Sequence, residues 1–212
     1  MKLIDLSVND FLNIVDSKSP APGGGSVSAL VSALGCTLGR MVAHLTFDKK
    51  KFKELPEWEQ ENFKSAFDEL NDCRRILEEL IDKDTVAYNL VMAGYKLPKE
   101  TEDEIKIRRI AIENNLKLAI ETPLEICKIS EKTLKLLKII LKYGNKNAIT
   151  DLGVSTILLY SGIEGGILNV KINLSSLNDE IFKMETLNQL ERILISSKEI
   201  KDEILNVVND SV

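Results

Sequence analysis

The chain has 212 residues, of which 44% are hydrophobic and 29% are charged, a composition typical of a globular protein that buries one sizeable core. Its formal net charge of −5 argues against nucleic acid as a main partner, because phosphate binding requires a basic surface. The three cysteines, Cys36, Cys73 and Cys127, lie far apart in apolar segments, so the sequence contains no disulfide framework or zinc-binding pattern and predicts buried, reduced thiols.

The N-terminal segment predicts a short helix, a proline-glycine loop and a second helix made largely of small residues. Ser7 is a suitable cap for the first helix, which should stop near Ser17. The second helix should reach about Thr46. Its low-charge run is the one membrane candidate, but serines, glycines and Arg40 interrupt it. Because the first residues also lack the apolar core of a signal peptide, we expect a buried helix in a cytoplasmic protein with no membrane partner.

A long helix is predicted from Pro56, a residue that suits a first helical turn, to the vicinity of Gly94. Along it, apolar residues recur at steps of three, four or seven, at Leu70, Cys73, Leu77, Leu80, Ala87 and Val91. A capping box at Thr101–Glu104 predicts the start of the next helix. Pro123 should kink or split that helix, which should end at Gly144.

The last third of the chain predicts two further helices. One should open at Asp151 and end at about Leu168, and the other should start at Asn178–Glu180 and reach almost to the C-terminus. Val170–Leu174 suits a short extended piece, although no run shows sustained two-residue alternation. With no repeat and no low-complexity linker, residues 1–212 are predicted to form a single all-α domain, a helical bundle of about six or seven helices.

Small side chains recur four residues apart in the helix that follows the proline-glycine loop. Ala29 and Ala33 have this spacing, as do Gly35 and Gly39, and it lets another helix backbone approach closely. The helix after Asp151 is also rich in small residues. We therefore expect the two small-residue helices to be neighbours, at the centre of the bundle or at a dimer seam.

Three consecutive glycines, Gly23, Gly24 and Gly25, directly precede the first of these helices, and Ser26 is able to cap it. Glycines at such a position expose backbone N–H groups, and a helix N-terminus favours anions. The triplet is therefore either a place where a carboxylate or polar ring edge of a ligand meets the backbone, or a turn that simply requires glycine. It is not a P-loop, because the required lysine does not follow.

Several motifs together resemble one family, the C-terminal domain of formiminotransferase-cyclodeaminase, whose signature stand-alone methenyltetrahydrofolate cyclohydrolases share. The motifs occur in the family's order: SPAPGGGSVSALVSALGCTLGRMVAHLT with FDKKKF, DTVAYNLVMAGYKLPKETEDE, Arg108, Ala111-Ile112, Thr122-Pro123-Leu124, YGNKNAITDLGV and EGGILNVKINL. The resemblance runs from Leu6 to at least Asp179 and lacks the formiminotransferase half. His44 stands where the family is expected to have asparagine, so it is a poor candidate for a shared catalytic base.

The resemblance implies an all-helical fold and a homodimer or larger assembly. It also implies a small-molecule substrate, a tetrahydrofolate that carries a one-carbon unit, with or without a polyglutamate tail. Two activities are known: closing 5-formiminotetrahydrofolate to 5,10-methenyltetrahydrofolate with loss of ammonia, and opening the methenyl compound with water to 10-formyltetrahydrofolate. Neither needs a metal, and the resemblance implies no cofactor beyond the tetrahydrofolate derivative itself. The sequence leaves open which of the two, or which other one-carbon folate reaction, this chain catalyses.

Asp84 is the first candidate for a catalytic residue. It lies on the apolar stripe of the long helix, where an aliphatic residue is expected, and a carboxylate aimed inward is costly unless it is paired or used. Both reactions pass through a tetrahedral carbon between N5 and N10 and need a general base and a general acid. The alternative is a structural ion pair with Arg108. Tyr88, one turn further on, is expected to be a core residue rather than to stack on the pterin.

The resemblance implies further site residues in the downstream motifs. Asp151 is either a second catalytic carboxylate or a helix cap. Asn145, Asn169 and Asn173 lie in loop-like motifs, where they either bind the edge of a pterin or form turns. Arg108 lies at the family's arginine position and is expected to bind substrate.

A dense basic run, Lys49, Lys50, Lys51 and Lys53, follows the small-residue helix. On an acidic protein a local positive patch can hold the glutamate tail of a folate. The alternative is an ordinary solvated loop.

Two classes of function remain. The first is a folate enzyme that acts at the carbon bridging N5 and N10. The second is a non-catalytic helical homo-oligomerisation module that retains the packing motifs. Asp84 distinguishes the two classes of function, because a purely structural protein gains nothing from a carboxylate on an apolar stripe.

Overall fold

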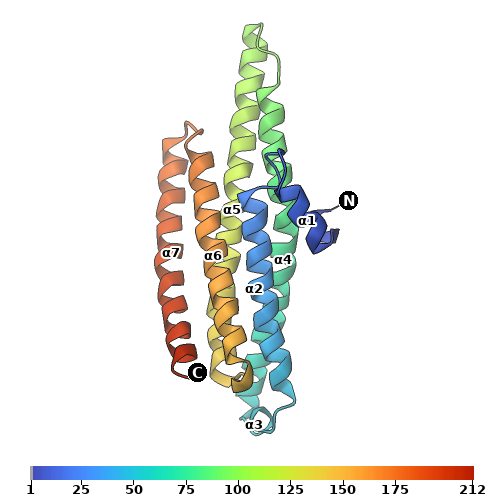
Figure 1. The fold of residues 1–212 in the computed structure, drawn as a ribbon. Helices are drawn as coiled ribbons and strands as arrows, with labels where there is room; N and C mark the ends of the chain where they lie inside the picture. The colour runs from blue at the N-terminus through green and yellow to red at the C-terminus, as the bar shows by residue number, and fades with distance from the viewer. Residues whose placement is uncertain (1) are drawn as a thin grey trace.

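The computed structural model describes residues 2–212 and contains long helices packed into a bundle, with no strand among those residues (Figure 1). The elements in chain order are η1 (Leu3–Asp5), α1 (Val8–Val15), α2 (Gly24–Phe47), α3 (Lys50–Lys53), α4 (Glu57–Tyr95), α5 (Glu102–Tyr143), η2 (Lys146–Ala148), α6 (Ile149–Leu174) and α7 (Glu180–Asn209). The prediction of a single all-α domain with six or seven helices is confirmed by the seven α-helices of the described residues. Met1, the first residue of the predicted domain, lies outside them.

Local capping signals start three of the helices where the sequence predicts. Ser7 Oγ and Asp179 Oδ1 each accept the backbone N–H three residues further on, at 3.1 and 3.0 Å. Thr101 and Glu104 form the predicted capping box, in which Glu104 Oε2 accepts the N–H of Thr101 at 3.0 Å. These side chains satisfy N–H groups that have no partner inside their own helix.

The start of α2 differs from the prediction. The helix begins at Gly24 with Gly23 as its N-cap, and Ser26 lies inside the first turn. The buried hydroxyl of Ser26 donates to the carbonyl oxygen of Ile81 at 2.8 Å, so the prediction that Ser26 caps the helix is wrong. The acceptor for the first turn comes from another helix, because the carboxylate of Asp84 in α4 accepts the N–H of Ser26.

The predicted split at Pro123 does not occur, and α5 runs unbroken from Glu102 to Tyr143. Pro123 has no N–H to donate to the carbonyl oxygen of Ala119, four residues earlier. Asn173 Nδ2, from α6, donates to that oxygen at 2.7 Å. A tertiary hydrogen bond therefore satisfies the acceptor that the proline leaves open.

The segment Val170–Leu174 is helical, and the prediction of an extended piece is wrong. α6 continues to Leu174 because Val170 and Leu174 are both buried and extend its apolar face. Asn169 and Asn173 consequently lie on a helix and not in a loop.

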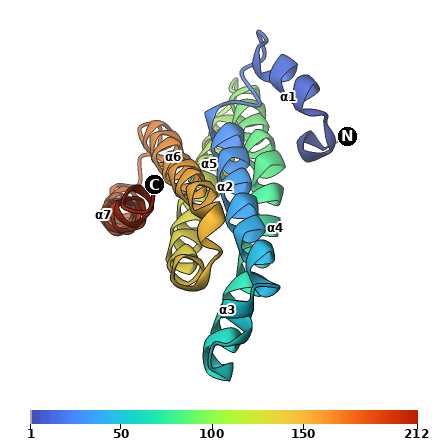
Figure 2. The ribbon, with the colours of Figure 1, turned by 60° about the horizontal axis from the view of Figure 1, so that its bottom comes forward.

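The two small-residue helices, α2 and α6, run side by side, with α4 and α5 behind them and α7 on the outer flank (Figure 2). They are antiparallel, since Gly24 packs against Asn169 while Gly35, further along α2, packs against Ser155 and Leu159. Ser155 Oγ donates to the carbonyl oxygen of Gly35 at 2.6 Å. This close backbone approach confirms the prediction that the small-residue helices are neighbours.

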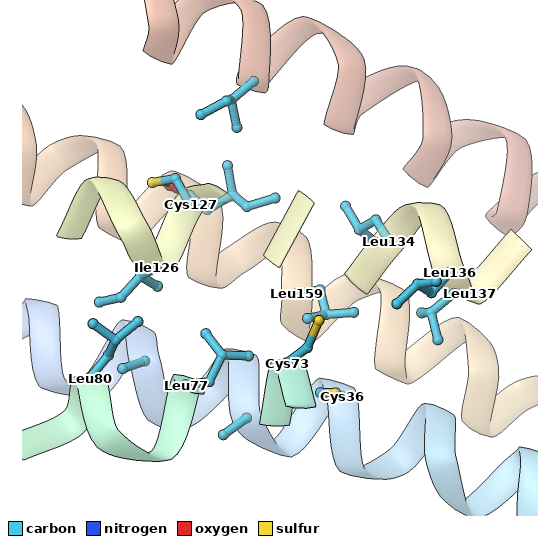
Figure 3. Packing of buried hydrophobic residues seen from close by; sticks show 14 of the residues in the cluster. Cys36, Cys73, Leu77, Leu80, Ile126, Cys127, Leu134, Leu136, Leu137 and Leu159 are labelled. Carbon is cyan, nitrogen blue, oxygen red and sulfur yellow. Dashed lines mark hydrogen bonds between the residues drawn. The ribbon is translucent and has the colours of Figure 1, made fainter. Parts of the chain in front are cut away.

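Aliphatic side chains from α4, α5 and α6 fill the space behind α2 (Figure 3). Leu77, Leu134 and Leu159 are fully buried there, which confirms the apolar stripe of the long helix. The three cysteines are free and buried, as predicted. Burial raises the pKa of Cys36 and of Cys127 to about 12, so both stay protonated thiols at neutral pH.

α2 is long and apolar enough to cross a membrane, judged by length and composition alone. Its most apolar 18-residue window is 56% buried inside the bundle. The helix packs against α4, α5 and α6, which is the environment that the sequence predicts for a core helix.

Candidate active site

A cleft of about 320 Å³ opens at the N-terminal end of α2, a volume within the range of pockets that bind small organic molecules. The proline-glycine loop, α4, α5 and α6 contribute its walls. Six of the ten predicted site residues line it: Gly23, Gly24, Gly25, Asp84, Asn169 and Asn173. The fold thus brings together residues from three separate motifs of the sequence.

The start of α2 holds the carboxylate of Asp84. Asp84 Oδ2 accepts the backbone N–H of Ser26 at 2.9 Å, and the hydroxyl of Ser26 lies 3.2 Å from the same oxygen. A helix N-terminus stabilises a negative charge at this position. Gly25 must be glycine for this contact, because a Cβ built there would overlap with Asp84 Oδ1.

Burial raises the pKa of Asp84 above the usual aspartate range, and the hydrogen bonds from Ser26 offset part of that rise. A carboxyl with a raised pKa in a cleft suits proton transfer near neutral pH. The alternative of a structural ion pair with Arg108 is wrong, because Arg108 Nη2 donates to the carbonyl oxygen of Tyr95 and no ion pair of Asp84 exists among residues 2–212.

The two asparagines of the cleft have their amide nitrogens tied to the protein. Asn169 Nδ2 donates to the carbonyl oxygen of Gly165 at 2.8 Å, and Asn173 Nδ2 donates to that of Ala119 at 2.7 Å. The Oδ1 atom of each residue and the second N–H of each amide remain for a ligand. Two fixed acceptors on one wall suit the N–H groups at the edge of a pterin ring.

Ser26 and Arg108 lie near the cleft but do not line it. Ser26 is fully buried behind Asp84, so its contacts with the carboxylate position that group and do not reach a ligand. Arg108 lines a neighbouring cavity of about 290 Å³.

Asn145 and Asp151 lie at the other end of the bundle. The backbone N–H of Asn145 donates to Thr46 Oγ1 at 2.9 Å, and Thr46 follows Gly25 by 21 residues of α2, about 30 Å at the helical rise. Asp151 lies in the first turn of α6, where Ala148 is the N-cap and no side chain caps the helix. Asp151 is therefore not a cap. Within one chain, neither Asn145 nor Asp151 lies near Asp84.

The fold and the site can be compared with known proteins. The family model described as formiminotransferase-cyclodeaminase matches residues 7–192. The chain belongs to this family. The resemblance of the sequence motifs is thereby confirmed.

Relatives of two kinds match the chain. A methenyltetrahydrofolate cyclohydrolase of Methylorubrum extorquens is 34% identical over 206 residues, which are 97% of each protein. A formimidoyltransferase-cyclodeaminase of Rattus norvegicus is 31% identical over 196 residues, and the matched part is 36% of that longer protein. The solved structure of formiminotetrahydrofolate cyclodeaminase from Thermotoga maritima superposes with a TM-score of 0.86 at 27% identity and covers 99% of this chain and 98% of that one.

A separate cavity of about 520 Å³ lies at the Asn145 end of the bundle, and the basic run contributes to its wall. We call it the lysine-lined cavity. Five lysines contribute to its wall and no carboxylate does: Lys49, Lys50, Lys51, Lys142 and Lys146. Lys53 instead lies 3.7 Å from Asp48 in an ion pair. The cavity is an anion-binding candidate, but it is separated from Asp84 by most of the length of α2.

Nine of the fifteen residues that line the cleft were not predicted as site residues from the sequence. Tyr88, expected in the core, is half-buried and lines the cleft, and so do the buried Leu116 and Ala119 of α5. Their helical spacing is that of any apolar face, so the pattern does not separate a cleft wall from a core contact. The spacing of Asp84 and Tyr88, one turn apart on α4, was the available signal.

Proposed function

We propose that this chain acts at the carbon that bridges N5 and N10 of a tetrahydrofolate, first of all as a methenyltetrahydrofolate cyclohydrolase. The observation that carries the proposal is the half-buried carboxyl of Asp84, which lines the cleft with a raised pKa and is held by the start of α2. The prediction of a one-carbon folate enzyme is confirmed by the named relatives. The relative with cyclohydrolase activity in its name matches over 97% of both proteins.

In the proposed hydrolysis, water adds to the cationic methenyl carbon while Asp84 takes one of its protons. The carboxylate also stabilises the positive charge of the bound substrate. When the bond between the carbon and N5 breaks, Asp84 returns its proton to N5. The new hydroxyl group loses its remaining proton to solvent, and the formyl group stays on N10. That these steps need no metal or second cofactor, and that the protein is cytoplasmic, both stay predictions.

The second candidate is the cyclodeaminase reaction, which the structural likeness to the Thermotoga maritima enzyme favours. Here N10 attacks the carbon of the protonated formimino group of 5-formiminotetrahydrofolate and gives its proton to Asp84. Asp84 then passes that proton to the amino group on the tetrahedral carbon, and the bond from carbon to this nitrogen breaks to release ammonia and leave the cationic methenyl product. The same carboxyl group at the same carbon thus serves either reaction.

Purified protein mixed with each folate separates the two activities. We expect 5,10-methenyltetrahydrofolate to lose its methenyl absorbance faster with protein than in buffer alone. A rise of that absorbance from 5-formiminotetrahydrofolate would establish the cyclodeaminase reaction instead. Traces that match buffer with both compounds would contradict the proposed function and favour the oligomerisation module.

We further propose that the chain is a homodimer whose interface is the open face of α2 and α6. Most half-exposed and exposed positions on that face are apolar: Val27, Leu30, Val31, Leu34, Leu38, Val154, Ile157 and Leu168. The exposed Thr37, Ser161 and Glu164 interrupt them, and Glu164 is the one carboxylate among these positions. The guanidinium of Arg40 is turned away onto the ring of Phe67, with Cζ 3.9 Å from the ring centroid. A twofold interface brings one surface against itself, and a nearly uncharged surface suits this because it contains few like charges to repel.

The cleft and the start of α6 lie at opposite ends of this face, so a dimer with antiparallel long axes explains how Asp151 and Asn145 can serve a site at Asp84. Leu34, 52% exposed on α2, and Ile195, 53% exposed on α7, provide matched positions for a test. We expect sedimentation to give a dimer for the wild type and for Ile195→Glu, and a monomer with strongly reduced turnover for Leu34→Glu. A monomeric wild type would contradict the proposed dimer, and a fully active monomer would rule out a contribution from a second copy.

A further inference from the structure

The cleft at Asp84 adjoins an arginine-lined cavity, which is bounded by the first part of α5 and by residues 176–178 after α6. This cavity has a volume of about 290 Å³. Leu116 and Ser176 line both cavities. The two cavities therefore adjoin each other along one side of α5.

Two arginines, Arg108 and Arg109, line the arginine-lined cavity. Arg108 donates through Nη2 to the carbonyl oxygen of Tyr95 at 3.2 Å, and its buried Nε has no partner among residues 2–212. Arg109 lines the same cavity and forms no ion pair within the described chain. The one carboxylate in the wall, Glu113, lies 3.9 Å from Lys117 in an ion pair. The cavity therefore offers positive charge and unused N–H donors to an anion.

The wall between Asp84 and the arginines is apolar and aromatic. Tyr88, Val91 and Tyr95 follow Asp84 at successive turns of α4, and Leu116 faces them from α5. Tyr95 follows Asp84 by eleven residues, about 16 Å along the helix axis. The site thus presents, in order, a carboxyl with fixed polar groups, an apolar channel and two guanidinium groups.

We propose, building on the proposed function, that Arg108 and Arg109 bind the carboxylates of the glutamate that is attached to the aminobenzoyl ring of the substrate. A folate has the same order of groups as the site: a polar fused ring, a neutral para-substituted ring and a dicarboxylate. With the reacting carbon at Asp84, the neutral ring lies along Tyr88 and Val91. Guanidinium groups bind carboxylates through paired N–H donors.

This arrangement gives the first glutamate a binding site within one chain. The lysine-lined cavity lies about 30 Å from Asp84 along α2, so it does not hold that glutamate in the same protomer. The two arginines also set the direction of the substrate, because the dicarboxylate and the pterin bind at opposite ends of the site.

Steady-state kinetics with two substrates test the inference. Arg109→Gln is the main variant, since Arg109 makes no ion pair within the chain, and Arg108→Gln is the second. With 5,10-methenyltetrahydrofolate we expect KM to rise about tenfold or more in each variant with little change in kcat, because each loses a charge-assisted contact to the bound substrate. With 5,10-methenyltetrahydropteroate, which lacks the glutamate, both variants should match the wild type.

Lys106→Gln is the matched control, because Lys106 is exposed on the same helix and does not line the cavity. It should leave KM for both substrates unchanged. An unchanged KM for the folate in Arg109→Gln, or an equal loss with the folate and the pteroate, would overturn the inference while the proposed function stands. Failure of the wild type to convert any folate would instead overturn the proposed function, and the inference with it. If Arg108→Gln does not fold, Arg109→Gln alone decides.

Discussion

Asp84→Asn is expected to lower kcat/KM by about 10³-fold at neutral pH, within the range that a general acid–base group contributes, and to leave the fold intact. Asparagine has the same shape as aspartate, and its Oδ1 can still accept the N–H of Ser26 that Asp84 Oδ2 accepts at 2.9 Å. The amide cannot take a proton from water or return one to nitrogen. Turnover should therefore be lost without loss of the α2 contact.

The same variant should change the pH dependence of stability in a defined direction. Burial raises the pKa of Asp84 in the folded state, so the folded chain binds a proton more tightly than the unfolded chain does. The stability that this proton provides is fully present below the unfolded pKa of the carboxyl and is lost as the pH rises through the raised folded pKa. Asp84→Asn avoids this loss, and we expect its Tm at neutral pH to equal or exceed that of the wild type.

Thermal melts between acid and neutral pH, together with a pH–rate profile, check both statements. The gain in Tm of Asp84→Asn over the wild type should shrink as the pH falls through the raised folded pKa of Asp84, and should be gone once the pH is below the ordinary aspartate range. Glu79→Gln is the control, because Glu79 is an exposed carboxylate of the same helix that pairs with Lys83 at 3.1 Å. It should leave turnover unchanged. Full activity of Asp84→Asn would remove Asp84 from the mechanism.

Gly162→Val is expected to destabilise the fold by about 3 kcal/mol, near the upper end of common overpacking effects. A Cβ at Gly162 would overlap with Ser32 Oγ and lie 3.0 Å from the carbonyl oxygen of Ser28. Ser32 is fully buried, and its hydroxyl accepts from Ser130 Oγ at 2.8 Å, so it has little room to move. Valine must therefore force α2 and α6 apart.

The expected change in Tm is a decrease of about 6–12 °C for a chain of this length, measured by circular dichroism. Ser161→Val is the matched control, because Ser161 precedes Gly162 and is exposed, and it should stay within about 0.5 kcal/mol of the wild type. The double variant Gly162→Val with Ser32→Ala should recover part of the loss, since it removes the overlapping hydroxyl. A Gly162→Val variant as stable as the wild type would show that the two helices do not pack at this distance.

The helices themselves follow from the sequence because their signals are local. A period of 3.6 residues marks the apolar face of α4 through Leu77 and its neighbours, and the capping box of Thr101 and Glu104 starts α5 with hydrogen bonds across four residues. Asp84 is conspicuous for the same reason, since it interrupts an apolar stripe. These features need no knowledge of the distant chain.

The sequence alone therefore determined the all-α class, the small-residue helices, the family and the carboxylate at the centre of the cleft. Only the tertiary structure decided that α5 passes through Pro123 with the help of Asn173, that Ser26 holds Asp84, and that Asn145 lies at the far end of the bundle. The physical reason is range: caps and periodic faces depend on neighbours within a few residues, whereas a contact between distant residues depends on the direction and register in which whole helices pack.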